Sequence, residues 1–253
     1  MNSWYDADVL EPMKLKPEDL AEMRDRYFEP KGYWATSRIE RVIGAAEIRP
    51  GDLILDLGCA RATFSFHAMK VGGRPISLDR DPIALFEGRE GARIIGGREL
   101  VPVCGDALQL PFADNFFDII INADFIEHTP DDVKQRLFNE MFRVLKPGGR
   151  GVVYTPNLAR VEWELFGERM KYRIGLRREK VPRWQDFVDP DHFGLTTPGH
   201  AQQLLDRAGF QTRPVYYDHH IPLVSRIPVV GALTRGRWPA HFSERFLIHV
   251  TKP

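Results

Sequence analysis

The amino-acid sequence predicts an α/β protein with a doubly wound, Rossmann-like sheet of seven mostly parallel strands, the last strand antiparallel, and helices on both faces. Three observations predict this fold. Short apolar runs alternate with helical stretches along the chain. These runs lack the polar alternation of half-exposed strands, as expected for strands covered on both faces. A chain of 253 residues that is 43% hydrophobic also has enough apolar material for a substantial core.

The predicted elements follow one another in a regular order. The expected strands are 52–56, 75–78, 100–104, 117–121, 151–155, 212–217 and 245–251. The expected helices are 63–70, 82–88, 131–145 and 198–208. The helix over 131–145 is amphipathic, with Val133, Leu137 and Met141 on one face, and Pro147-Gly148-Gly149 is expected to stop it. This order predicts a parallel sheet with crossover helices.

Two segments do not follow this alternation of strands and helices, and both are too long to be loops without secondary structure. Residues 1–45 are predicted to form an N-terminal helical or lid segment, and residues 46–253 the main domain. Within that domain, residues 157–195 are predicted to form a cap insertion over the carboxyl ends of the strands. Aromatic residues mark this insertion, namely Trp163, Phe166, Tyr172, Trp184 and Phe187.

Composition and charge exclude several classes of protein. Lys+Arg and Asp+Glu are 35 each, so no net charge attracts the chain to nucleic acid or an anionic membrane. Its longest apolar runs are far short of the ~18 residues that span a bilayer. The two cysteines, Cys59 and Cys104, are expected to be small core residues rather than a disulfide or a metal pair. A cytoplasmic, reducing location is therefore expected.

The turn after the first strand is the candidate ligand site, because such sheets bind ligands at the carboxyl ends of their strands. Asp56 ends the strand, and the small residues Gly58, Ala60 and Ala62 follow at every second position, with Cys59 between the first two. A dinucleotide site would have G-x-G-x-x-G here. That glycine pattern is absent, which disfavours a nicotinamide-dependent oxidoreductase.

This turn resembles motif I of the class I S-adenosylmethionine-dependent methyltransferases, usually written D/E-x-G-x-G-x-G. The resemblance extends to the small-molecule branch typified by quinone methyltransferases. Ala60 and Ala62 replace the second and third glycines. The turn tolerates these replacements if neither alanine needs a positive φ.

Further segments match the same family in order, over residues 36–217. The resemblance implies that Asp79, followed by Arg80, binds the ribose hydroxyls of the cofactor. It implies that Gly105-Asp106-Ala107 holds the adenine, and that Asn122-Ala123-Asp124 flanks the methionine moiety. It therefore implies S-adenosylmethionine as cofactor, S-adenosylhomocysteine as product, and no metal.

Each candidate also has a structural alternative. Asp56 would cap the first helix, and Asp79 or Asp81 the second, because Asp is a common N-cap. Asp106, Asn122 and Asp124 would be turn residues.

The implied chemistry is in-line displacement of the sulfonium methyl group by a nucleophile of the acceptor. A hydroxyl acceptor usually needs a base, and the candidates are His128 and His192, with His219 and His220 as further options. A metal site built on Asp189, Asp191 and these last three histidines lacks a compact ligand spacing.

A small-molecule or lipid-type acceptor is predicted. Nucleic acid is disfavoured because Asn122-Ala123-Asp124-Phe125 departs from the Asx-Pro-Pro-aromatic motif of nucleic-acid amino methyltransferases. A basic run that includes Arg177 and Arg178 is predicted to recognise an anionic acceptor group, unless it is only a solvated face. The apolar loop 221–233 would receive an acyl or isoprenoid portion, and peripheral membrane contact is compatible with the sequence.

Three residues of the N-terminal segment, Tyr33, Trp34 and Arg38, are predicted to help close the site over the substrate.

The alternative to an enzyme is a regulatory or inactive protein that binds the cofactor without turnover. The sequence does not determine the acceptor, the atom methylated or the oligomeric state.

Overall fold

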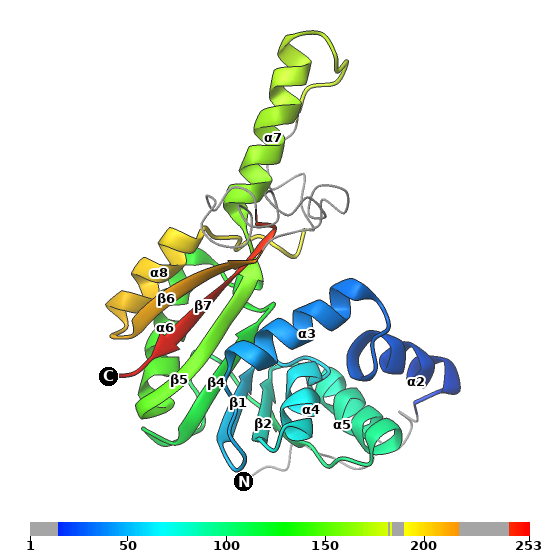
Figure 1. The fold of residues 1–253 in the computed structure, drawn as a ribbon, viewed down its shortest axis with the longest axis vertical. Helices are drawn as coiled ribbons and strands as arrows, with labels where there is room; N and C mark the ends of the chain where they lie inside the picture. The colour runs from blue at the N-terminus through cyan, green and yellow to red at the C-terminus, as the bar shows by residue number, and fades with distance from the viewer. Residues whose placement is uncertain (1–14, 182, 184–189, 218–242) are drawn as a thin grey trace, which may run out of the picture. The chain divides into compact units, whose positions relative to one another are not determined.

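The computed structural model describes residues 15–181, 183, 190–217 and 243–253. Its strands form a seven-stranded sheet in the order β3-β2-β1-β4-β5-β7-β6 (Figure 1). β1 pairs in parallel with β2 and with β4, β2 pairs in parallel with β3, and β6 pairs antiparallel with β7. The predicted α/β fold with an antiparallel last strand is confirmed. The chain divides into two compact units, 1–122 with 143–151 and 123–142 with 152–253.

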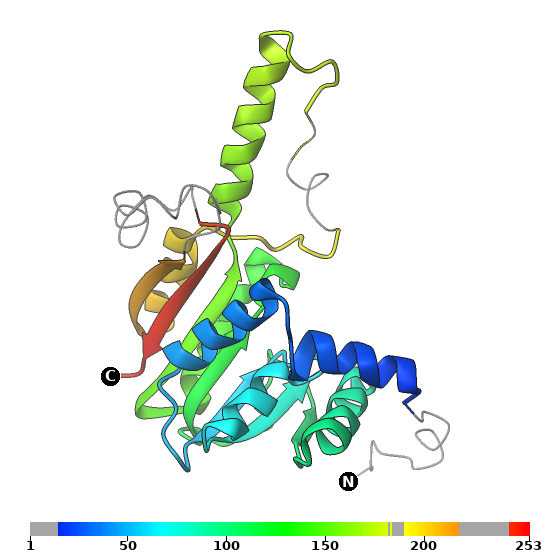
Figure 2. The same cartoon turned by 45° about the vertical axis from the view of Figure 1, so that its right-hand side comes forward.

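The first unit carries strands on both sides of the switch in strand order between β1 and β4. These are β1 (Leu53–Leu57), β2 (Arg74–Asp79), β3 (Val101–Cys104) and most of β4 (Phe117–Ala123). Helices α4 (Thr63–Lys70) and α5 (Pro82–Gly96) pack against this sheet (Figures 1 and 2). The parallel register pairs Leu57 with Leu78 and Asp79 with Cys104. The carboxyl ends of the first three strands therefore meet at one edge.

Two predicted helix boundaries are wrong. The helix expected over 82–88 continues to Gly96. Asp81 caps its start by accepting hydrogen bonds from the amides of Ile83 and Ala84, and Gly97, with a left-handed φ of 59°, ends it. The next helix, α6, is Asp131–Val144, and β5 (Leu145–Pro156) begins at once, so Pro147-Gly148-Gly149 lies inside the strand.

The end of α6 needs no glycine stop. The amides of Asn115 and Phe116 donate to the carbonyl oxygens of Arg143 and Val144, at 2.9 and 2.8 Å. These long-range hydrogen bonds satisfy groups that a C-terminal glycine turn would otherwise satisfy.

The N-terminal segment forms α2 (Pro17–Met23), a π-helix (Arg24–Phe28) and α3 (Tyr33–Ala45). Met23 and Phe28 are buried in the same cluster as Phe66 of α4. A Cβ atom on Gly91 of α5 would lie 2.5 Å from the Met23 Cε atom, so this glycine lets α2 approach closely. Residues 17–28 thus share the core of the first unit, and the lid function of the segment stays a prediction.

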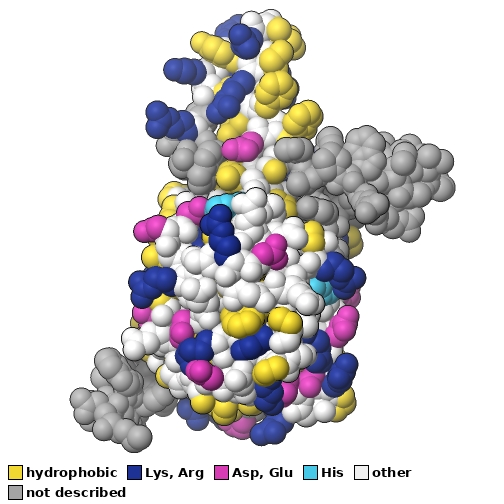
Figure 3. All heavy atoms as spheres, turned by 90° about the vertical axis from the view of Figure 1, so that its left-hand side faces the viewer, with side chains coloured by type: hydrophobic (Ala, Val, Ile, Leu, Met, Phe, Trp, Pro, Cys, Tyr) yellow, Lys and Arg dark blue, Asp and Glu magenta, His cyan; other side chains and the backbone are white. Residues whose placement is uncertain are grey.

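The second unit contains the remaining elements, which lie in residues 123–142 and 152–253. They are a 3-10 turn (Ile126–His128), most of α6, the end of β5, α7 (Leu158–Arg173), α8 (Pro198–Arg207), β6 (Gln211–Tyr217) and β7 (Arg245–Thr251). Helix α7 begins the predicted cap insertion. Hydrophobic and basic side chains both lie along its surface (Figure 3). No helix in the described part of the chain is long and apolar enough to cross a membrane.

Candidate functional site

The turn after β1 has a left-handed backbone at all three of its small residues. The φ angle is 73° at Gly58, 46° at Ala60 and 58° at Ala62. Left-handed φ costs a residue with a Cβ about 1–2 kcal/mol. The sequence allowed the two alanines without strain only if neither had a positive φ. Both have one, so the turn is strained at both positions.

Asp56 holds this turn against the first helix. Its side chain is 1% exposed, and its Oδ2 accepts hydrogen bonds from the Ser65 amide at 2.8 Å and the Ser65 hydroxyl at 2.7 Å. The Ser77 hydroxyl of β2 in turn donates to the Ser65 oxygen at 2.7 Å. Ser65 lies in the first turn of α4, so this geometry is that of the helix-capping alternative. The cofactor-binding role of Asp56 stays a prediction.

The electrostatics of Asp56 follow from this burial. Burial raises the pKa of the Asp56 carboxyl from 3.8 to about 6, although the Ser65 hydrogen bonds and the positive charge of Arg38 lower it. A carboxyl with this pKa is still mostly charged at pH 7. It therefore remains an acceptor for both Ser65 donors.

Asp79 joins the turn to the end of β2. Its Oδ2 accepts a hydrogen bond from the Ala60 amide at 2.7 Å, and its Oδ1 accepts one from the Asp81 amide at 3.0 Å. Each carboxylate oxygen has a second lone pair for a further donor. Asp81, rather than Asp79, caps α5. The neighbouring Arg80 is exposed, and its carbonyl oxygen lies 3.6 Å from the Cys104 sulfur.

The turn after β3 lies beside this carboxylate. The Gly105 amide donates to the Asp79 carbonyl oxygen at 2.9 Å. Asp106 is exposed, and its Oδ1 accepts from the Leu108 amide at 2.8 Å, which is the geometry of an Asx turn. Ala107 is half-buried. Both thiols, Cys59 and Cys104, are unbridged.

Asn122 supplies a test of whether the site suits a polar ligand. Its amide nitrogen donates to the Leu57 carbonyl oxygen at 3.2 Å. Its Oδ1 is buried, and no described group donates a hydrogen bond to it. A buried oxygen without a donor costs free energy unless a ligand or water supplies the donor. Together with the Asp79 carboxylate, this oxygen fits a ligand rich in hydroxyl and amine donors, as an adenosyl amino acid is.

Sequence reasoning missed Gly88, which lies in the middle of α5. A Cβ atom at this position would lie 2.7 Å from the carbonyl carbon and oxygen of Arg61 in the turn after β1. The adjacent Glu87 accepts a hydrogen bond from the Arg61 guanidinium at 2.7 Å. Helix α5 thus packs directly against the backbone of this turn and holds it through the Arg61–Glu87 contact. In the sequence Gly88 marked the end of the helix predicted over 82–88, so no local pattern indicated this role.

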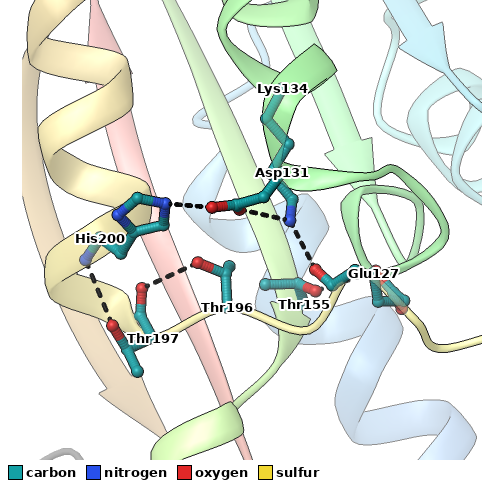
Figure 4. Close-up of polar contacts among 8 residues, drawn as sticks. Glu127, Asp131, Lys134, Thr155, Thr196, Thr197 and His200 are labelled. Carbon is teal, nitrogen blue, oxygen red and sulfur yellow. Dashed lines mark hydrogen bonds and ion pairs between the residues drawn. The ribbon is translucent and has the colours of Figure 1, made fainter. Parts of the chain in front are cut away.

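A second group of charged residues follows β4 and belongs to the second unit. Asp124 has a φ of 55° and forms an ion pair with Arg245 of β7. Glu127 is 1% exposed and accepts a hydrogen bond from the Thr155 hydroxyl at 2.8 Å (Figure 4). Burial and the Asp124 charge raise the pKa of Glu127 from 4.5 to about 8, against the opposing effects of Thr155 and Arg245. Neither Glu127 nor Arg245 was a candidate from sequence.

The two candidate bases lie together. The His128 and His192 rings are 5.0 Å apart between centroids, and the His128 Nδ1 is 2.8 Å from the Asp191 carbonyl oxygen. A carboxylate oxygen of Glu127 and a ring nitrogen of each histidine all lie within 4.8 Å of one another. The further candidates His219 and His220, with Asp189 and the loop 221–233, are outside the described residues.

The predicted substrate residues belong to both units, Tyr33, Trp34 and Arg38 to the first and Arg177 and Arg178 to the second. Tyr33 and Trp34 are 54% and 52% exposed, with their rings edge to face at 5.6 Å. The Arg38 guanidinium lies 5.2 Å from the Phe64 ring centroid in α4, which places it near motif I. Within the cap insertion, Arg177 forms an ion pair with Glu168 at 2.8 Å, and Arg178 is exposed. Of the cap aromatics, Trp184 and Phe187 are outside the described residues.

Comparisons with known proteins find one family. A family model described as a methyltransferase domain matches residues 54–149. A demethylmenaquinone methyltransferase from Staphylococcus carnosus is 34% identical over 192 residues, which are 73% of this chain and 76% of that protein. A sterol 24-C-methyltransferase from Yarrowia lipolytica is 32% identical over 151 residues, which are 56% of this chain but 36% of that protein. The chain thus spans about a third of the sterol relative.

A solved structure, that of a SAM-dependent methyltransferase from Archaeoglobus fulgidus, has a similar fold. Its TM-score is 0.56 at 17% identity, and the alignment covers 94% of this chain and 100% of that one. At this identity the similarity concerns the fold alone.

Proposed function

The chain belongs to the class I S-adenosylmethionine-dependent methyltransferases, and from this premise we propose that it transfers a methyl group from S-adenosylmethionine to a small-molecule or lipid-type acceptor. The observation that carries the proposal is the contact between Asp79 and the turn after β1. The Asp79 carboxylate, 2.7 Å from the Ala60 amide, lies where two strand ends and the strained turn meet. A strained turn held by a charged side chain is typical of ligand sites.

The bound cofactor would supply an electrophilic methyl group on a sulfonium centre. The chain's own residues would do the positioning. Asp79 would accept hydrogen bonds from the ribose hydroxyls, the segment 105–107 would lie along the adenine, and Asn122 Oδ1 would receive a donor from the amino acid portion. Alignment of the acceptor at ~3–3.5 Å from the methyl carbon can lower the barrier by several kcal/mol.

Two observations support a lipid-type acceptor. The relatives with matching sequences are named for demethylmenaquinone and for a sterol. Six large hydrophobic residues of α7 and the turn after it are 40–77% exposed. They are Trp163, Phe166, Met170, Tyr172, Ile174 and Leu176. Exposed apolar side chains in this number are typical of a surface that binds an apolar ligand or partner.

An anionic group on the acceptor remains part of the proposal, with Arg178 as the more accessible of the two arginines. Arg177 already pairs with Glu168. His128 and His192 are the candidate bases for a hydroxyl acceptor.

The first test is calorimetric titration with S-adenosylmethionine and S-adenosylhomocysteine, with NAD as a control ligand. We expect micromolar binding of the first two and none of NAD. Asp79→Ala should weaken S-adenosylhomocysteine binding by about 1.5–3 kcal/mol, the scale for loss of charged hydrogen bonds. Asp114→Ala, which alters an exposed ion pair elsewhere in the first unit, is the matched control. Unchanged affinity in folded Asp79→Ala would refute the placement of the ribose.

The strain at Ala60 and Ala62 favours one alternative, a protein that binds the cofactor but does not turn over. Transfer of a labelled methyl group to demethylated quinone and sterol acceptors separates the two functions. Tight cofactor binding without transfer to any acceptor of the panel would favour the binding protein.

A further inference from the structure

We propose that Glu127, His128 and His192 form a binding site for one divalent transition-metal ion of the Zn²⁺ type. The three residues offer one carboxylate oxygen and two imidazole nitrogens, within 4.8 Å of one another. Two histidines and one carboxylate are an established ligand set for Zn²⁺ and for non-haem Fe²⁺. The site lies in the second unit and does not depend on the proposed methyl transfer.

The geometry needs little change to hold a metal. Ligand atoms at about 2.1 Å from a tetrahedral ion lie about 3.4 Å apart. The atoms here lie within 4.8 Å of one another, so they have to approach by up to about 1.4 Å. His128 is exposed and His192 is half-buried, so the site is open to an ion from solvent. Three protein ligands would leave positions for water or for an oxygen atom of a bound molecule.

The groups around the ligands orient them for metal binding. The His128 Nδ1 lies 2.8 Å from the Asp191 carbonyl oxygen, which accepts a hydrogen bond only if Nδ1 carries the proton. This tautomer leaves the lone pair on Nε2, as is usual for a metal-binding histidine. The Thr155 hydroxyl donates to Oε2 of Glu127 at 2.8 Å and so fixes the orientation of the carboxylate.

The backbone holds the distant histidine in place through Gly194. The Gly194 amide donates to the Glu127 carbonyl oxygen at 2.7 Å. A Cβ atom on Gly194 would lie 2.1 Å from the Thr129 carbonyl oxygen, so only glycine allows this approach. The fully buried Lys134 donates to the Gly194 carbonyl oxygen at 2.6 Å and pairs with Asp131 at 3.0 Å (Figure 4). His192, two residues before Gly194, is therefore held beside the turn that carries Glu127 and His128.

The local charge suits a cation. Arg245 is paired with Asp124, so these two charges offset each other beside the site. An ion would bind Glu127 as the ionised carboxylate and both histidines as neutral imidazoles, so metal binding displaces the proton that Glu127, with its raised pKa, otherwise holds near pH 7. If a metal is bound, the two histidines serve as ligands and are not free to act as bases.

The family resemblance implied no metal, and the set of Asp189, Asp191, His192, His219 and His220 has no compact ligand spacing. Glu127 and His128 were not combined with His192, which lies far along the chain. The contacts of Gly194 with Glu127 and of Asp191 with His128 bring them together.

The test is a zinc titration of tag-free protein that has been stripped with a chelator. Competition with a chromophoric chelator measures the dissociation constant, and Co²⁺ in place of Zn²⁺ reports nitrogen ligands by its visible absorption. We expect one tight Zn²⁺ per chain. His192→Ala and Glu127→Gln should each weaken the affinity at least about 100-fold, since loss of even an outer-shell partner costs 10–100-fold.

Controls separate this site from others. His67→Ala, in α4, and the double variant His219→Ala/His220→Ala should bind Zn²⁺ like the wild type. Circular dichroism and thermal melts establish that each variant is folded, and S-adenosylhomocysteine titration of each shows whether the cofactor site is intact. Failure of the unaltered protein to bind Zn²⁺, or wild-type affinity in His192→Ala, or loss of the ion in the His219→Ala/His220→Ala variant, would overturn the proposal.

Discussion

Replacing each alanine of the turn after β1 by glycine tests whether the left-handed backbone is under strain. Both residues have positive φ, 46° at Ala60 and 58° at Ala62. They differ in their surroundings, because Ala60 is exposed while Ala62 is 2% exposed and packs in the core cluster with Phe66. The two substitutions therefore share one energetic effect and differ in another.

The shared effect is relief of strain. Glycine removes about 1–2 kcal/mol of left-handed strain, and its greater freedom in the unfolded chain costs about 0.5–1 kcal/mol. Ala60→Gly should therefore raise the free energy of unfolding by about 0.5–1 kcal/mol. Ala62→Gly gains the same amount but loses a buried methyl group worth about 1 kcal/mol. It should leave stability unchanged or slightly lower.

Urea denaturation of both variants measures this difference. The expected result is that Ala60→Gly is more stable than Ala62→Gly by about 1 kcal/mol, with the same dependence on urea. Gly58→Ala, at φ 73°, is the reverse control and should destabilise the protein by about 0.5–1 kcal/mol, the same balance of strain and unfolded-state freedom with opposite sign. If Ala60→Gly lowers stability, or the two glycine variants are equal, the reasoning from strain and burial is refuted.

Two further predictions concern the support of the same turn. Asp56 has its pKa raised by burial to about 6 from 3.8, so the stability it contributes is complete below about pH 4 and is lost as pH rises to 6. The unfolding free energy of the wild type should therefore fall by about 2–2.5 kcal/mol relative to Asp56→Asn between pH 4 and 7, measured by urea denaturation, and a constant difference would contradict the assignment. Gly88→Ala should weaken S-adenosylhomocysteine binding about tenfold or more and destabilise the protein by about 1–3 kcal/mol, because the added Cβ would lie 2.7 Å from Arg61. Gly44→Ala in α3, where a Cβ meets nothing within 4 Å, should instead stabilise the helix, and equal effects of the two alanines would exclude the steric explanation.

Much of the fold follows from local sequence. Apolar runs such as Leu53-Ile54-Leu55 are recognisable because a strand covered on both faces has no polar positions. Motif I and Asp79 are recognisable because each lies at the carboxyl end of a strand. The expected glycine stop of α6 was wrong for a physical reason. The amides of Asn115 and Phe116, far along the chain, bond the last carbonyl groups of this helix instead.

The sequence by itself determined the class of fold, the family and the strand ends at which the cofactor is expected, because these depend on residues close together in the chain. The tertiary structure decided which side chains meet. It decided that Asp56 contacts Ser65, that Gly88 supports the backbone of Arg61, and that His192 lies beside Glu127. Such contacts depend on the path of the backbone between distant residues, which no local pattern of residue types specifies.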